Sequence, residues 1–546
     1  MMKFLPILLL FHYTISAQAQ VRNPLQNTKT TEQAKVSTMS TNDHEALNAL
    51  PKDVSKFKAI GFVSYSDFGA IGDGVTDAID AIAATHEFAN QHSLPVKAGE
   101  NATYYISGKE RPVVIQTDTD FGTAAFVIDD RNVENYRSEV FLVDASQPSI
   151  ELPGISSLRK NQKKIDVSLP QSCLITVTNS ETKHYVRSGA NQTNGAPQTD
   201  IFIVDANGNV NQDTPIIWDF DHITEISALP IDEKTLNITG GRFTTIANNA
   251  ESKYTYYARG ITIKRSNVCL DGLEHYVRDE GDQGAPYRAF IGVNDSYNVT
   301  IQNTTLTGRK TYETIGAAGS PVSMGSYDFY ALRAVNVSLV NCEQTNDIND
   351  PTYWGIMASS YSKNITYDHC TLSRFDAHKG VANASILNST LGHMGINAIG
   401  CGVLTVENTT IHARKLINLR SDYGSTWEGE LIIRNCVFAP KKGSAQGTEL
   451  IGGQNSGQHD FGYTCYMPER IRIETLHIDD SKDPKKAPGP ALFTDFNPEM
   501  TDESYRQEFP YILTKEVTIS NVTTASGKAL RISNNPFMFK DVVIHN

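Results

Sequence analysis

The chain has 546 residues, enough for several small domains or for one extended architecture. Hydrophobic residues make up 40% and charged residues 20%, which argues against a disordered chain and against a multi-span membrane protein. With 48 Lys and Arg against 61 Asp and Glu, the formal net charge is -13, and this argues against nucleic acid as a partner.

The N-terminus has the pattern of a secretory signal peptide. A basic start is followed by a short apolar run over residues 4–15 and by an Ala-x-Ala ending at Ala17 and Ala19, which predicts a signal peptide over residues 1–19. The apolar run is too short for a membrane-spanning helix, and a buried N-terminal helix is the alternative. We therefore expect a secreted or periplasmic protein without an integral membrane span.

Residues 20–55 are polar and predict a flexible leader. Next comes the run Asp-Phe-Gly-Ala-Ile-Gly-Asp-Gly-Val-Thr-Asp over residues 67–77, followed by a helical apolar pattern that includes Ile79, Ile82, Phe88 and Ala89. The run resembles the entry motif of the pectate-lyase superfamily, D-F-G-A-x-G-D-G-x-T-D. That resemblance implies an all-β, right-handed parallel β-helix, with a short helix in an N-terminal cap. It leaves the chemistry open, because the same cap precedes hydrolases, lyases and phage tailspikes.

Short apolar strands with an Asn-containing end recur through the second half of the chain. The residues that end three of these elements, 370, 389 and 409, are 19 and 20 positions apart. Repeats of this size are typical of a β-solenoid. The expected regions are a cap with first coils over 56–130, early coils with an excursion over 131–235, and a parallel β-helix with long turn insertions over 236–546. The repeated elements are residues 237–241, 268–272, 299–304, 337–342, 365–370, 385–389, 404–409 and 431–436.

Two residue types mark equivalent places in these repeats. Many Asn residues fall in Asn-x-Ser/Thr, which could be glycosylated, but their strict position favours Asn side chains hydrogen-bonded from coil to coil. The seven Cys residues are odd in number, sparse and without a C-x-x-C pair, so we expect core packing rather than a disulfide framework or a zinc site.

A cationic stretch over residues 374–420 interrupts this acidic chain. Neighbouring coils of a β-solenoid lie about 4.8 Å apart. Counting from the residue that ends each repeated element predicts that Arg374 stacks on His393, with Arg414 and Lys415 on the next coil. The same count places His378 over Asn397. A solvated charged turn is one interpretation, and a cleft for an anionic polysaccharide is the other.

Three functions are compatible with this stretch. A lyase acting on a uronate polymer of glycosaminoglycan or pectin type would use Arg to neutralise the sugar carboxylate, His as base and Tyr423 or a second His as acid. A glycoside hydrolase would need two carboxyl groups, for which Asp376 and Asp422 are the best pair. A non-catalytic binder would stack sugars on aromatic rings such as Tyr353 and Trp354. The catalytic candidates are His378, His393, Arg420, Tyr423, Asp376 and Asp422, and the substrate-binding candidates are Arg374, Lys379, Asn397, Arg414, Lys415 and Trp427.

Acidic clusters raise the question of Ca²⁺. Asp279, Glu280 and Asp282 lie close together, as do Asp347 and Asp350, and carboxylates are the ligands that Ca²⁺ prefers. The spacing does not match an EF-hand loop, so an ordinary acidic turn is the favoured interpretation. We predict no metal site and no required cofactor, with Ca²⁺ as the alternative.

Overall fold

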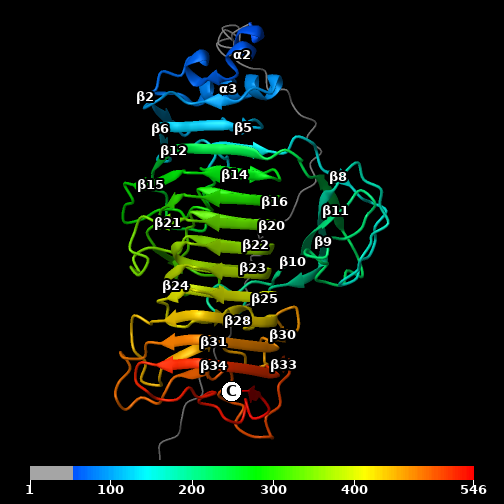
Figure 1. Ribbon diagram of the computed structural model, residues 1–546, viewed down its shortest axis with the longest axis vertical. Coiled ribbons are helices and arrows are strands. Elements are labelled where there is room, and N and C mark those ends of the chain that lie inside the picture. Colours follow the sequence, from blue (N-terminus) through cyan, green and yellow to red (C-terminus); the bar gives the residue numbers. More distant parts are fainter. Residues whose placement is uncertain (1–52, 546) are drawn as a thin grey trace, which may run out of the picture. The chain divides into compact units, whose positions relative to one another are not determined.

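The computed structural model describes residues 53–545, and the signal-peptide prediction and most of the predicted leader fall outside this range. The described chain is a right-handed parallel β-helix with short helices at its N-terminal end, as predicted (Figure 1). Its coils stack so that each strand hydrogen-bonds to the equivalent strand of the next coil, and 27 strands join one continuous sheet. Within residues 53–545, none of the helices has the length and apolar character needed to cross a bilayer.

The N-terminal cap contains α2 (Val54–Ile60), the 3₁₀ turn η1 (Tyr65–Phe68) and α3 (Ile79–His92). The helical apolar pattern is confirmed, because Ile79, Ile82, Phe88 and Ala89 are all buried. The Gly-Asp-Gly part of the motif makes a tight turn in which the Asp73 carboxylate accepts the backbone N–H groups of Val75 and Thr76. The cap therefore covers one end of the apolar core.

The coils take their stability from apolar side chains that stack inside the β-helix. Val299 pairs with Val337, and Val337 pairs with Ile365, and all three are fully buried. Removing such stacks from water supplies the core that no single coil could form. The first coil strands are β1 (Val63–Ser64), β2 (Asp73–Asp77), β3 (Val96–Lys97), β4 (Thr103–Ile106), β5 (Val113–Ile115), β6 (Thr119–Asp129), β7 (Phe141–Asp144), β12 (Leu236–Ile246), β13 (Ile261–Lys264), β14 (Val268–Asp271), β15 (Glu274–Arg278), β16 (Ile291–Gln302) and β17 (Thr305–Leu306).

The later coils continue the same sheet toward the C-terminus (Figure 1). Their strands are β20 (Phe329–Val340), β21 (Glu343–Gln344), β22 (Met357–Asp368), β23 (Thr371–Leu387), β24 (Thr390–Ala398), β25 (Gly400–Glu407), β26 (Thr410–Ile411), β27 (Ile417–Leu419), β28 (Trp427–Phe438), β29 (Glu449–Gly452), β31 (Arg470–Ile478), β32 (Ala491–Phe493), β34 (Glu516–Thr524) and β35 (Val543–His545). Two small pairs lie in turn insertions, namely β18 (Tyr312–Ile315) with β19 (Pro321–Met324), and β30 (Cys465–Tyr466) with β33 (Tyr511–Ile512).

Asparagines at the turns form ladders along the coils, which confirms the hydrogen-bonding interpretation of the repeated Asn positions. Asn341 donates from its side-chain amide to Asn303 at 2.8 Å, and Asn408 donates to Asn388 at 3.0 Å. All four residues have φ between 49° and 52°, in the left-handed region that Asn adopts more readily than most residues. The same residue therefore makes the turn and links neighbouring coils.

The prediction that cysteines of the repeats pack in the core is also confirmed. Cys342 and Cys370 occupy equivalent places in neighbouring coils, and both are buried together with Cys436 of β28. All seven cysteines are free thiols.

A lateral insert, residues 147–231, interrupts the coils between β7 and β12 (Figure 1). It folds as a four-stranded antiparallel sheet in the order β10-β9-β11-β8, with an apolar core of its own. Its strands are β8 (Ile150–Glu151), β9 (Cys173–His184), β10 (Ala196–Val204) and β11 (Glu225–Pro230). The insert also contacts the coils, because Lys363 of β22 is buried against Asp200 of β10 at 2.8 Å.

Candidate active site

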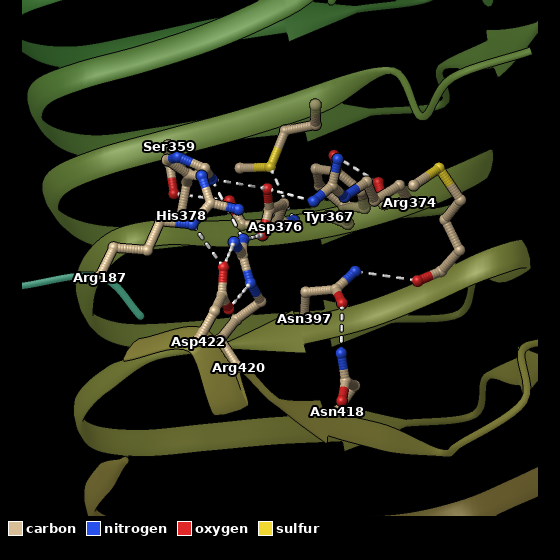
Figure 2. Close-up of polar contacts among 12 residues, drawn as sticks. Arg187, Ser359, Tyr367, Arg374, Asp376, His378, Asn397, Asn418, Arg420 and Asp422 are labelled. Atoms are coloured by element: carbon tan, nitrogen blue, oxygen red, sulfur yellow. Dashed lines mark hydrogen bonds and ion pairs between the residues drawn. The ribbon is translucent and has the colours of Figure 1, made fainter. Parts of the chain in front are cut away.

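A charged cluster lies on the outer face of the coils at β23. Arg374, Asp376 and His378 alternate along this strand, and alternate residues of a strand point to the same face. Arg420 follows β27, and Asp422 lies in the short 3₁₀ turn η2 (Ser421–Tyr423) after it. Figure 2 shows these side chains converging from neighbouring coils. We call these five residues, together with Arg187, the charged cluster.

Asp376 is the centre of the charged cluster. It is fully buried and lies 2.5 Å from Arg374 Nη2 and 3.4 Å from Arg420 Nη1. Burial by itself would raise the pKa of Asp376, but Arg374, His378 and Arg420 together lower it below its ordinary value. Asp376 is therefore a permanent anion that holds two guanidinium groups in place.

Asp422 is held in the same way at the more exposed side of the charged cluster. Arg420 donates to both of its carboxylate oxygens at 2.9 and 2.7 Å, and Arg187 donates to it at 2.7 Å. Arg187 belongs to the lateral insert and reaches across to the coils (Figure 2). These cations outweigh the effect of burial and lower the pKa of Asp422. Both carboxyl groups of the charged cluster are therefore ionised.

His378 contacts both an arginine and a carboxylate of the charged cluster. Its Nδ1 lies 3.1 Å from Arg420 Nη1 and 3.5 Å from Asp376 Oδ2. Burial lowers the pKa of His378 to about 4, although Asp376 works in the opposite direction. At neutral pH, His378 is therefore an uncharged ring, 23% exposed, that offers an N–H group.

Tyr423 supports the guanidinium groups rather than facing solvent. Its ring centroid lies 5.3 Å from Arg187 and 5.1 Å from Arg420, and the residue is only 2% exposed. Burial raises the pKa of Tyr423 to about 12. Such cation–π packing fixes the two arginines but leaves the phenol poorly placed to act as an acid.

Lys379 and Tyr327 border the charged cluster. Burial, and then the charge of Arg187, lowers the pKa of Lys379 below its usual value. Tyr327 is partly exposed, and Arg374, Asp376 and Arg420 all act on its pKa, which burial raises. Sequence reasoning missed Tyr327 and Arg187, because both lie in irregular segments that carry no repeat signal.

Several predicted neighbours are not brought together, and the physical reason is a shift in strand register. Between Leu372 and Arg374 the pairing of β23 with β24 slips, so Arg374 pairs with Gly395 instead of His393. His393 contacts the Ile348 carbonyl through its backbone N–H and through Nδ1. The predicted stacking of Arg374 on His393 is therefore wrong.

The prediction that His378 lies over Asn397 is wrong for the same reason, since Asn397 pairs with Asp376. Arg414 is exposed, while Lys415 is used in an ion pair with Glu449. Trp427 is fully buried, and its indole N–H donates to the Gly402 carbonyl, so it cannot stack on a sugar.

The acidic turns satisfy their carboxylates locally. Glu280 accepts the backbone N–H of Lys310, and Asp347 and Asp350 accept N–H groups of their own loop. Across residues 53–545, no group of three or more His, Cys, Asp or Glu side chains is arranged to hold a metal ion.

No protein-family model matches this chain. A capsule KL64-specific depolymerase of Klebsiella phage P510 is 30% identical over 129 residues, which cover 20% of this chain and 12% of that protein's length. The tailspike of Pseudomonas phage phi297 has a similar structure, with a TM-score of 0.52 at 12% identity over 89% of this chain and 84% of the tailspike. The tailspike of Acinetobacter baumannii bacteriophage AP22, solved with an A. baumannii capsular saccharide, gives 0.51 at 10% identity over 90% of this chain and 80% of that tailspike. At these identities the two structures show a shared β-helix fold.

Proposed function

We propose that the charged cluster binds an anionic polysaccharide and cleaves it by β-elimination. The observation that carries this proposal is that three arginines contact the two carboxyl groups, Asp376 and Asp422, and lower the pKa of each. A hydrolase needs one carboxyl group that keeps its proton and donates it to the leaving oxygen. Neither Asp376 nor Asp422 keeps a proton, so this pair does not support hydrolysis.

The surplus of positive charge supports an anionic substrate. Three guanidinium groups, from Arg187, Arg374 and Arg420, face two carboxylates, and Lys379 adds a further cation when protonated. Arg187 is 22% exposed, so it has surface with which to contact a ligand. In this scheme Arg187 neutralises the carboxylate of a uronate-type sugar, which makes the adjacent C5 proton more acidic.

The remaining steps have candidates in the same place. Lys379, whose pKa is lowered, would remove the C5 proton in its neutral form. The electron pair of the broken C5–H bond then forms the C4–C5 double bond as the C4–O bond breaks. His378, with its proton on Nε2, would hydrogen-bond the departing oxygen, which finally takes its proton from water.

The comparisons suggest which polymers to test first. One relative is named as a capsule depolymerase, and one similar structure holds a capsular saccharide, so acidic bacterial capsular polysaccharides come before pectin and glycosaminoglycans. We propose that the protein acts outside the cell that carries such a capsule.

The test is ultraviolet absorbance of the unsaturated product during incubation with these polymers. We expect wild-type protein to raise the absorbance, and Lys379→Met and Lys379→Arg each to lower the rate by about a hundredfold or more, because both remove the base. Lys486→Met, at an exposed position in another loop, is the matched control and should retain the wild-type rate.

Two other results would overturn the proposal. New reducing ends without a rise in absorbance would indicate a hydrolase, and binding without cleavage of any polymer would indicate a carbohydrate-binding protein. A Lys379→Met variant with wild-type turnover would remove Lys379 from the mechanism.

A further inference from the structure

A cavity of about 320 Å³ lies where the lateral insert meets the coils, next to the charged cluster. The insert contributes Trp218 and Gln198 to its wall, and the coils contribute Tyr361 and Cys401. Cavities of this size with a mainly apolar lining and a few polar groups are typical of small-molecule sites. Neither the repeat pattern nor the cationic stretch pointed to this cavity.

The cavity walls are rich in aromatic rings. The His184 ring packs edge-on against Trp218 with centroids 4.4 Å apart, and Tyr185 lies 5.2 Å from Tyr463 and 5.7 Å from Tyr361. All five residues line the cavity. Flat rings beside polar groups are the surface that the C–H faces of a sugar ring contact favourably.

Four of the five charged groups of the cavity are matched in pairs. Lys363 is buried against Asp200, and Lys160 lies 2.8 Å from Glu428. The fifth charged group is Asp219, so the wall has no net positive charge with which to attract an anion. This contrasts with the surplus of arginines in the neighbouring charged cluster.

One buried polar atom in this wall has no partner. His184 is 6% exposed, and its Nδ1 makes no hydrogen bond. Burial lowers the pKa of His184 to about 4, so the ring is neutral and adds no charge to the wall.

The cavity and the charged cluster share a wall. Tyr185 lines the cavity, while Arg187, two residues later, binds Asp422 of the charged cluster. Gly380 lines the same cavity two residues after His378, and a Cβ there would lie 1.9 Å from the Tyr185 hydroxyl. The cavity therefore lies directly beside the charged cluster.

We infer that this cavity binds one uncharged sugar unit, either a neutral hexose or an N-acetylhexosamine, of the polysaccharide that the charged cluster holds. The inference rests on the proposed function for its biological setting, but the binding itself does not require cleavage. The protein then selects polymers in which a neutral sugar adjoins or branches from the acidic one.

Saturation-transfer NMR on the full chain tests this directly with glucose, galactose, N-acetylglucosamine and N-acetylgalactosamine, and with glucuronate as the anionic comparison. We expect at least one neutral sugar to bind, and glucuronate to bind less tightly than that sugar. Trp218→Ala should weaken neutral-sugar binding about tenfold by removing the aromatic platform, and Trp218→Phe should retain most of it.

Cys401→Phe fills the cavity from the coil side and should abolish the binding, so it decides the matter if Trp218→Ala fails to fold. Lys379→Met should bind the neutral sugar like the wild type, which separates this inference from the lyase proposal. Absence of binding by every neutral sugar, preference for glucuronate, or unchanged binding in Cys401→Phe would each overturn the inference.

Discussion

At the scale of single residues, burial and nearby charge lower the pKa values of two neighbouring groups of the charged cluster for different reasons. Asp376 and His378 are two positions apart on one strand, and both have lowered pKa values. For Asp376 the cause is the nearby arginines, which favour the charged carboxylate. For His378 the main cause is burial, which disfavours the charged imidazolium. Asp376 is therefore an anion across the neutral range, and His378 is an uncharged ring.

The lowered pKa of His378 predicts a loss of stability in mild acid. The unfolded chain binds a proton at His378 below an ordinary value of 6.5, whereas the folded chain binds it only below about 4, so stability falls as pH drops between these values. Between pH 7 and pH 5 we expect this residue to cost about 2 kcal/mol of unfolding free energy. His378→Asn should lose correspondingly less stability over this interval, as measured by denaturant unfolding at both pH values.

If His378→Asn has the same pH dependence as the wild type, His378 is not buried in its neutral form.

At the scale of elements, the turns between strands are as regular as the strands themselves. Left-handed Asn residues recur at the same corner of successive coils, and each amide donates to the preceding coil. A short polar side chain is needed at this corner, because it tolerates positive φ and reaches its neighbour at the spacing of the coils. The corner therefore contributes to coil register independently of the apolar core.

Asn388 offers a test of this view, since it donates to Asp368 at 2.8 Å, accepts from Asn408 at 3.0 Å and has φ 49°. Asn388→Ala should lower the free energy of unfolding by about 2 kcal/mol, about half from lost hydrogen bonds and half from Ala in the left-handed region. Asn388→Gly keeps the backbone conformation without strain and should cost about half as much. Denaturant unfolding measures both, and a Gly variant less stable than the Ala variant would contradict the role of φ.

At the scale of the whole molecule, the lateral insert is an addition to a β-helix whose coils pair with one another without it. The chain leaves the coils after β7 and returns before β12, and the two ends are adjacent, because the Ser146 N–H lies 3.4 Å from an Asp232 carboxylate oxygen. The insert also has its own apolar core. It nevertheless supplies Arg187 to the charged cluster and Trp218 to the cavity.

We predict that replacing residues 147–231 with a short Gly-rich linker leaves a folded β-helix that has lost cleavage. The β-helix should fold because its coil strands pair with one another directly. Cleavage should be lost because the deletion removes Arg187 and the insert's side of the cavity wall. Circular dichroism and cooperative melting check the fold, and the absorbance assay checks activity. A truncated chain that cleaves at the wild-type rate would show that the insert takes no part in catalysis.

The sequence could predict the coils but only part of the site. Arg374, Asp376, His378 and Arg420 were named within the cationic stretch and Asp422 just after it, and all five meet in the structure. The stacking on His393 was wrong because one register slip in β23 moves every later side chain relative to the next coil. Trp427 was misassigned because an aromatic residue at a strand start reads the same whether it points inward or outward.

By itself, the sequence determined the β-helix, its cap, the Asn ladders and the burial of the repeat cysteines. These features depend on the alternation of apolar and polar residues and on turn residues that repeat from coil to coil. They can therefore be predicted from the sequence alone. Only the tertiary structure decided that Arg187 joins Asp422, although 235 positions separate them, and that Trp218 and Cys401 face one cavity. Contacts between the irregular lateral insert and the repeating coils do not recur at a fixed sequence spacing. The residues that meet there are determined by packing in three dimensions.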